Sequence, residues 1–199
     1  MTKGAATRRA ILSHAGRLAT QVGLEGVTIG RLAIELSLSK SGLFAHFRSK
    51  EELQMQTIEH QQRRFVDLVV TPVLATPGGE PRVTALFERW MAWRTGQPGG
   101  CFFAAASFEL DDRPGLVRDR LADLQREWLA TIARIAASAV KRGAFRADLD
   151  CELWAHEFYG MMLSYHLAEQ LLRDPNATER TRRAFGQLLA RSRATAAAA

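Results

Sequence analysis

Cysteine is nearly absent from the 199-residue sequence: only Cys101 and Cys151 occur, and they form no pairing pattern. Small disulfide-stapled domains and zinc-binding modules need several cysteines at short, regular spacings. The sequence therefore excludes both classes. We expect a protein that keeps its thiols reduced, in the cytoplasm.

Long apolar runs are also missing, since no stretch approaches the roughly 18 apolar residues that a helix needs to span a bilayer. The first twenty residues carry several charges, including Lys3, Arg8 and Arg17, which a secretory signal would not tolerate. No stretch alternates with period two for long, so strands are not expected. Because 47% of the residues are hydrophobic, we predict an all-α protein with a sizeable core and no membrane partner.

The motifs of common enzyme sites are missing as well. The sequence has no His-Glu-x-x-His, no glycine-rich phosphate loop after a strand and no Glu-x-x-His pair. Glu152 and His156 stand four residues apart and could share a metal, but a surface pair or a polar group in a pocket is the simpler interpretation. We expect no catalytic residues, metal or cofactor, and an enzyme with a polar or metal site in the helical part is the first alternative.

The positive charge is confined to one part of the chain. The formal net charge is +6, and residues 1–50 account for all of it, with eight Lys or Arg against Glu25 and Glu35. Such an excess makes a one-sided positive field, which is typical of a nucleic-acid-binding surface. A basic tail with solvated side chains is the simpler alternative.

Two short helical patterns, residues 28–36 and 40–47, are separated by three residues, which is the spacing of a helix-turn-helix. We assign Leu43 and Phe47 to the core between the crossing helices. The outward face of the second helix then consists of small and basic residues: Lys40, Ser41, Gly42, Ala45 and His46. Such a face suits close approach to a groove lined by phosphates.

Caps and apolar periodicity predict about nine helices in all. We expect frayed residues 1–6, a first helix from a cap at Thr7 to Gly23, and a fourth helix from the capping box at Ser49 to Val70 or Leu74. Five more helices follow the break around Pro77. This pattern predicts a three-helix basic domain over residues 1–50, which the helix-turn-helix makes a DNA-binding domain, and a second helical domain over residues 51–199.

The predicted helix from about Asp150 to Leu172 is apolar on two sides. A helix of a monomer needs only one apolar face against its own core. The second stripe therefore predicts a partner surface. With two apolar positions of the last helix, its residues are the candidates for a subunit interface: Gly160, Leu163, Ser164, Leu167, Leu171, Phe185 and Leu188.

The run SLSKSGLFAHFRSKEEL, with the stop at Gly23 and the cap at Thr28, resembles the DNA-binding signature of the TetR (tetracycline-repressor-like) family of bacterial transcriptional regulators. The resemblance extends closely from Arg8 to about Met55. The remainder resembles the family in its helix count and lengths, and in a general likeness of GGCFFAAASFELDDRPG and the following helix to one branch of its C-terminal domains. The family architecture is a helix-turn-helix unit followed by a variable ligand-binding and dimerisation domain.

The resemblance implies roles for single residues. Thr28 and Lys50 would hold phosphates at the two edges of the motif, and His46 would contact the backbone nearby. Four residues would enter the major groove, with Lys40 the best candidate for a guanine edge: Ser39, Lys40, Ser41 and Gly42. Phe44 stands where the family often has Tyr, so it would pack or touch a thymine methyl, and Arg31 would contact phosphate or face water.

Aromatic and methionine side chains are frequent in the C-terminal part. For any single residue an ordinary core role has the better odds, but together with the resemblance they imply a cavity for an apolar or aromatic effector. The candidate lining residues are Trp90, Trp93, Phe103, Phe108, Trp128, Phe158, Tyr159 and Met162.

The sequence thus predicts a DNA-binding transcriptional regulator, a repressor by family analogy, whose dimer binds a palindromic double-stranded operator and responds to a small molecule. Besides an enzyme, the alternative is a protein that coats nucleic acid without sequence preference.

Overall fold

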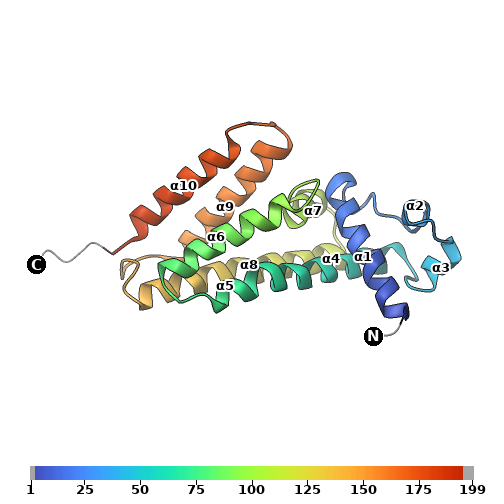
Figure 1. The fold of residues 1–199 in the computed structure, drawn as a ribbon, viewed down its shortest axis with the longest axis horizontal. Helices are drawn as coiled ribbons and strands as arrows, with labels where there is room; N and C mark the ends of the chain where they lie inside the picture. The colour runs from blue at the N-terminus through green and yellow to red at the C-terminus, as the bar shows by residue number, and fades with distance from the viewer. Residues whose placement is uncertain (1–2, 195–199) are drawn as a thin grey trace, which may run out of the picture. The chain divides into compact units, whose positions relative to one another are not determined.

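The computed structural model describes residues 3–194, in which the chain forms ten α-helices and one π-helical segment (Figure 1). The first part contains α1 (Lys3–Val22), α2 (Ile29–Glu35), α3 (Lys40–Phe44), α4 (Lys50–Phe65), η1 (Val66–Val70) and α5 (Thr71–Ala75). The second part contains α6 (Glu80–Thr95), α7 (Phe102–Leu110), α8 (Leu116–Lys141), α9 (Cys151–Gln170) and α10 (Ala177–Ser192). Within the described residues the only extended pairing is one isolated bridge, so the predicted all-α fold is confirmed.

The first helix begins earlier than predicted. It starts at Lys3 rather than after a cap at Thr7, because Ala5 and Ala6 have the highest helix propensity and extend the helix beyond the expected cap. Of the residues predicted to be frayed, 3–6 are therefore helical, and 1–2 lie outside the described part. The helix ends as predicted at Gly23, which has a φ of +77°.

Three side-chain caps start the next helices where the sequence predicts. Thr28 Oγ1 accepts a hydrogen bond from Arg31 N at 3.2 Å, and Ser49 Oγ accepts one from Glu52 N at 3.0 Å. Ser39 caps α3 in the same way. The caps fix the chain direction at both ends of the helix-turn-helix, because each satisfies an amide that has no partner within its own helix.

The predicted long fourth helix is α4, η1 and α5 in succession, which together reach Ala75. Counted as one element, they give the nine helices that the sequence predicts. Pro72 lacks an N–H group and its ring crowds the carbonyl four residues earlier. The wider π-helical turn of residues 66–70 ends two residues before this proline and contains the carbonyl that its ring would crowd.

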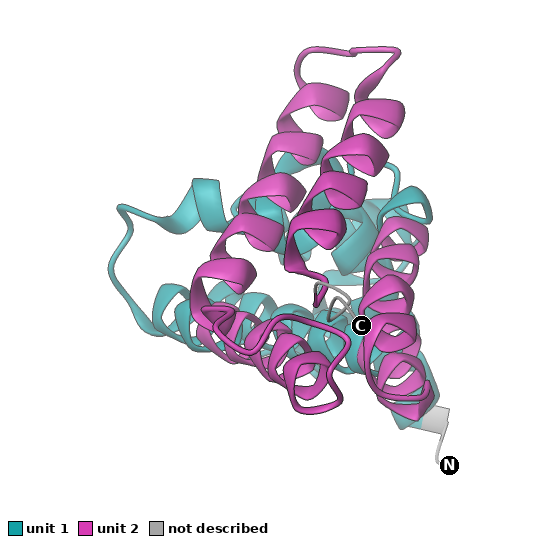
Figure 2. Cartoon of the chain, turned by 90° about the vertical axis from the view of Figure 1, so that its left-hand side faces the viewer, with its two compact units in different colours: residues 1–66, 94–124 teal, residues 67–93, 125–199 magenta. Residues whose placement is uncertain are grey.

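The chain divides into two compact units (Figure 2). Unit 1 comprises residues 1–66 and 94–124, and unit 2 comprises residues 67–93 and 125–199, so α6 and α8 contribute to both. These units reflect packing. The functional boundary at residue 50 stays a prediction.

The core of unit 1 lies between α1 and α4. Ile11, Leu18 and Leu53 are among its buried side chains. A Cβ on Gly16 would lie 1.5 Å from Nε2 of the buried Gln61, so this glycine permits the close approach of the two helices. The basic helix-turn-helix therefore rests on a packed two-helix base.

The core of unit 2 is rich in aromatic rings. Phe87 of α6 stacks on Phe185 of α10, with ring centroids 4.1 Å apart and an interplanar angle of 4°. Trp154 donates a buried hydrogen bond from Nε1 to Ser192 Oγ at 3.0 Å. α9 and α10 lie side by side as an antiparallel pair (Figures 1 and 2), and these contacts hold the pair to α6.

Candidate nucleic-acid interface

The predicted helix-turn-helix is present, with its apolar side closed. Leu32 of α2, Leu43 of α3 and Phe47 just after α3 are each 0% exposed. Ser37 in the turn has a φ of +52°, which lets the chain reverse between the two helices. The assignment of Leu43 and Phe47 to the core is therefore confirmed.

The opposite side of α3 faces solvent. Lys40, Ser41, Gly42 and Ala45 are exposed, and the ring of Phe44 is 51% exposed. A Cβ on Gly42 would meet only the hydroxyl of Ser39, at 3.0 Å, so packing within the described chain does not demand glycine there. A half-exposed phenylalanine beside a lysine that has no ion pair among the described residues suits a partner with both apolar and anionic groups.

The first edge of the motif contains an ion-pair cluster around Glu35. His14 Nε2 lies 2.7 Å from one carboxylate oxygen, and Arg31 donates from Nε to the other at 2.9 Å. These hydrogen bonds, from His14 first and then Arg31, lower the pKa of the Glu35 carboxyl below its usual range. Arg31 of α2 therefore already has an ion-pair partner, Glu35, before any DNA binds.

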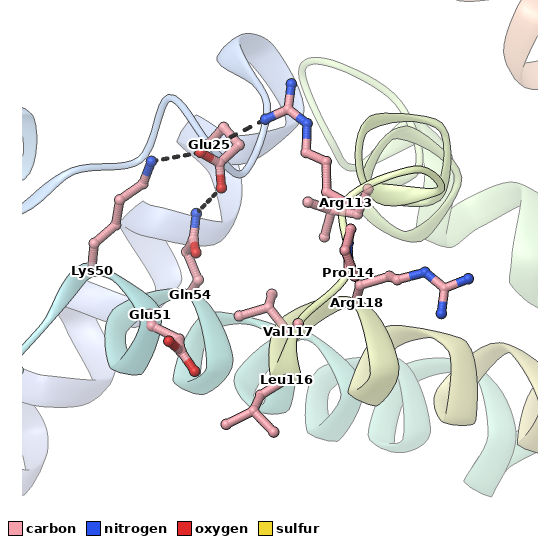
Figure 3. A pocket seen from close by; sticks show the side chains of 11 residues that line it. Glu25, Lys50, Glu51, Gln54, Arg113, Pro114, Leu116, Val117 and Arg118 are labelled. Atoms are coloured by element: carbon pink, nitrogen blue, oxygen red, sulfur yellow. Dashed lines mark hydrogen bonds and ion pairs between the residues drawn. The ribbon is translucent and has the colours of Figure 1, made fainter.

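The second edge contains a similar cluster around Glu25, in the loop between α1 and α2 (Figure 3). Lys50 Nζ lies 2.7 Å from Glu25 Oε2, and Gln54 Nε2 donates to Oε1 at 2.8 Å. Arg113 Nη1 approaches Oε2 at 3.8 Å. The hydrogen bonds from Lys50 and Gln54 lower the pKa of the Glu25 carboxyl, so it is an anion at neutral pH.

A cavity of about 340 Å³ adjoins this second cluster (Figure 3). Its lining combines Lys50 and Glu51 at the start of α4 with Arg113 from the segment between α7 and α8 and with Leu116, the first residue of α8. The start of α4, which carries the predicted phosphate contact, therefore lies next to residues more than sixty positions later in the chain.

All nine predicted DNA-contacting residues lie in unit 1 and reach solvent. Seven are exposed, and the remaining two, Thr28 and His46, are partly exposed. The sequence analysis did not identify Glu25 and Glu35 as partners of the basic residues. The 25-residue separation of Glu25 and Lys50 leaves no local pattern, whereas Arg31 and Glu35 stand four residues apart on one helix and could have been paired from the sequence. The exposure of the apolar side chain of Ile34 on α2, which is 79% exposed, was not predicted either.

Two family models match this chain. The model described as bacterial regulatory proteins, tetR family, matches residues 11–54. The model described as tetracyclin repressor-like, C-terminal domain, matches residues 79–185. The chain belongs to the TetR family. It is a transcriptional regulator with N-terminal DNA-binding helices and a C-terminal regulatory domain, as the resemblance implied.

Solved structures of other TetR-family proteins share this fold. A regulator from Cytophaga hutchinsonii is 17% identical, with a TM-score of 0.86 over 98% of this chain and 99% of that chain. One from Chloroflexus aurantiacus is 22% identical, with a TM-score of 0.83 over 96% of each chain. AibR, solved with isovaleryl coenzyme A and operator DNA, is 22% identical, with a TM-score of 0.70 over 91% of this chain and 95% of that chain. A comparison with curated protein sequences gave no match.

The predicted effector-contacting residues of this TetR-family protein do not share one environment. Phe103 and Phe108 belong to unit 1, where Phe103 is buried and Phe108 is 60% exposed. The other six belong to unit 2, in which five are buried and Tyr159 is partly exposed. Trp90 packs edge-on against Tyr165, with centroids 5.6 Å apart, while its buried Nε1 has no hydrogen-bond partner among the described residues.

The predicted dimer residues fall into two groups. Gly160, Ser164, Leu167 and Leu171 are exposed on α9 and Leu163 is partly exposed, whereas Phe185 and Leu188 are only 5% and 4% exposed. The side chains of these last two residues pack in the core of their own subunit, and their place at a subunit interface stays a prediction. Leu153, 55% exposed and seven residues before Gly160, lies on the same face of α9 and was missed.

The described residues contain neither a membrane-spanning helix nor a cluster of metal-binding side chains. None of their helices is long and apolar enough to cross a membrane. No group of three or more His, Cys, Asp or Glu side chains in residues 3–194 has the arrangement of a metal site.

Proposed function

We propose that this TetR-family regulator acts in the cytoplasm as a homodimeric repressor that binds a palindromic operator and is controlled by a small apolar or aromatic effector. The observation that carries the proposal is the exposed face of α3, with Lys40, Ser41 and Phe44 outward and Leu43 and Phe47 locked inward. A short helix whose buried face is packed against the domain core and whose exposed face is basic suits insertion into a major groove.

Base contacts and phosphate contacts are separated in this proposal. Lys40 forms no ion pair within the described chain, so its ammonium is available for a guanine edge. Thr28 and Lys50 contact phosphates at the two edges of the motif, and Arg31 contacts a phosphate from α2. Such contacts position the protein without reading sequence. Phe44 contacts a thymine methyl, because its ring offers no hydroxyl for a phosphate.

The exposed stripe of α9 supports the homodimer. Leu153, Leu167 and Leu171 lie on one face of the helix with Gly160 between them, and a Cβ on Gly160 would meet nothing within 4 Å. A second copy of α9 can approach closely at this small residue and cover the three leucines. Two copies of α3 then bind half-sites about one helical turn apart, roughly 34 Å or a multiple of it.

The orphaned indole N–H of Trp90 supports an effector site in unit 2. A buried donor without an acceptor is destabilising, and a ligand oxygen placed beside it would remove that cost. The aromatic rings that pack around Trp90 favour a ligand that is otherwise apolar or aromatic. The effector prefers the dimer conformation whose two α3 helices do not match the half-site spacing, and it thereby weakens operator binding. The coupling free energy between two such sites is typically about 1–3 kcal/mol.

Selection of bound fragments from a random DNA pool tests the proposal. The expected result is a palindrome whose half-sites are separated by about one helical turn or a multiple. Recovery of sequences without symmetry would contradict homodimeric operator binding. A panel of aromatic acids and short acyl-coenzyme A thioesters, including isovaleryl coenzyme A because the similar protein AibR binds it, then tests effector release.

A further inference from the structure

Glu109, the penultimate residue of α7, is bound to the loop between α1 and α2. Its Oε2 accepts a hydrogen bond from Leu24 N at 2.6 Å, and its Oε1 accepts one from Glu25 N at 2.9 Å. Successive backbone amides that follow a residue with positive φ form a concave anion-binding site, and Gly23 supplies that φ at +77°. The carboxylate of Glu109 therefore occupies an anion site made by residues 23–25.

Gly23 is required at this site for two reasons. Its φ lies in the region that favours glycine, and a Cβ there would lie 2.5 to 2.9 Å from the three atoms of the Glu109 carboxylate group. The same residue that ends α1 thus leaves the space into which Glu109 fits.

The loop is held on its other side by α4. Gln54 Nε2 donates to Leu24 O at 3.2 Å and to Glu25 Oε1 at 2.8 Å, and Lys50 Nζ donates to Glu25 Oε2 at 2.7 Å. Glu109 fixes the backbone of Glu25, and the side chain of Glu25 fixes the ammonium of Lys50. A lysine ammonium has three donors, so two remain for a phosphate after Glu25 takes one.

We propose that Glu109 is a positioning residue for operator binding: it fixes the loop at Leu24 and Glu25, and through Glu25 it orients Lys50 toward a DNA phosphate. This inference rests on the proposed function of Lys50. Glu109 lies in the segment that matches the C-terminal family model, whereas Glu25 and Lys50 lie in the segment that matches the DNA-binding model. A shift of α7 in the regulatory domain is therefore transmitted to a phosphate contact.

The test compares Glu109→Gln with the wild type in the full-length protein. Glutamine has nearly the same shape, but it presents one acceptor and one donor to two backbone N–H groups, so one of them loses its partner. We expect operator affinity to fall by about threefold to tenfold, because a charge-assisted contact is lost while the fold is kept. We also expect the slope of log affinity against log salt to fall by about 1, as it does when one phosphate contact is lost.

Asp112→Asn is the matched control. Asp112 is exposed in the segment that follows α7, and its substitution removes the same charge. Removal of a negative charge near DNA by itself strengthens binding. The charge effect therefore predicts equal or tighter binding for both variants, whereas the positioning role predicts weaker binding for Glu109→Gln alone.

A double-mutant cycle with Lys50→Ala separates positioning from general destabilisation. If Glu109 acts through Lys50, then Glu109→Gln causes no further loss of affinity or of salt slope in the Lys50→Ala background. Additive losses in the double mutant, or wild-type affinity and slope in Glu109→Gln, would overturn the proposal. Thermal unfolding followed by circular dichroism confirms that each variant is folded, and Glu109→Asp, which keeps the charge at shorter reach, replaces Glu109→Gln if that variant does not fold.

Failure of the proposed function is distinguishable from failure of this inference. If the wild type shows no preference for any palindrome, operator recognition fails. The same cycle is then measured on non-specific DNA, because a phosphate contact persists there. Equal salt slopes for Glu109→Gln and Lys50→Ala support the positioning role in either case, and a wild-type slope for Glu109→Gln overturns it.

Discussion

His14 of α1 and Glu35 of α2 are joined by a contact of 2.7 Å between Nε2 and Oε2, and the other oxygen of Glu35 accepts from Arg31. Because Glu35 is 21 residues from His14, this contact ties the first helix to the helix-turn-helix. It also places an anion beside a basic residue that we assign to a DNA phosphate. DNA must therefore compete with Glu35 for Arg31.

Glu35→Gln releases Arg31 and removes one negative charge next to the DNA-binding face. We expect tighter binding to operator and to non-specific DNA alike, by about two- to fivefold at low salt, with a smaller difference at high salt because exposed charges are screened. Fluorescence anisotropy with labelled duplexes at two salt concentrations measures the change. Arg31→Ala in the Glu35→Gln background should abolish the gain, and its persistence there would contradict the competition.

Lys40→Ala and Lys50→Ala should weaken DNA binding in different ways. Lys40→Ala loses a base contact, so it should cost about 1–3 kcal/mol on the operator and narrow the discrimination between operator and scrambled DNA. Lys50→Ala should weaken all sequences about equally and lower the salt slope by about 1. Affinities of both variants for both duplexes across a salt series decide the matter. Identical behaviour of the two variants would refute the assignment of roles.

His60 should make the stability of the protein fall in mild acid. It is buried between α1 and α4 with Nε2 2.9 Å from Ser13 Oγ, and burial, with Arg64, Arg63 and Arg9 nearby, lowers the pKa of its imidazole below 6.5. The folded state thus binds a proton more weakly than the unfolded state does. Its contribution to the free energy of unfolding is complete above about pH 6.5 and falls as the pH drops below that value, by at most about 1.4 kcal/mol per unit.

Urea unfolding at pH 7.5 and pH 5.5 measures this effect. His60→Gln removes the titrating group, so the variant should lose less stability than the wild type over the same interval. His156→Gln, a substitution at an exposed position of α9, is the control and should behave like the wild type. Equal losses in the wild type and in His60→Gln would assign the acid sensitivity to another group.

Leu167→Glu should convert the dimer to a monomer. Leu167 is 49% exposed on the α9 stripe, and a glutamate there would place two like charges in the proposed interface and bury them. Leu74→Glu, at a leucine of α5 that is 50% exposed, is the matched control. Sedimentation velocity should show a monomer for Leu167→Glu and a dimer for the control. A dimer in both would place the interface elsewhere.

Local sequence signals predicted the DNA-binding part closely. The caps at Thr28 and Ser49 and the stop at Gly23 lie where the sequence places them, because capping depends on residues only a few positions apart. The end of α3 differs, since its last regular residue is Phe44 and the chain turns before the buried Phe47.

Contacts between distant residues could not be predicted in the same way. The burial of His60 and Gln61 depends on a close approach at Gly16 that no local pattern reveals. The two hydrogen bonds of Glu109 span 85 and 84 residues. Phe185 shows the same limit, because the sequence does not say whether an apolar face of α10 is covered by the same subunit or by a partner. In the structure, Phe185 stacks on Phe87 of the same chain.

Discrimination between DNA sequences at constant salt tests the central claim most directly. The measurement is the ratio of affinities for the selected palindrome and for a scrambled duplex of the same length and composition. An operator-binding regulator should prefer the palindrome by about 10³-fold or more. Comparable affinities for the two duplexes, both falling steeply with salt, would contradict the account and indicate a protein that coats DNA without reading it.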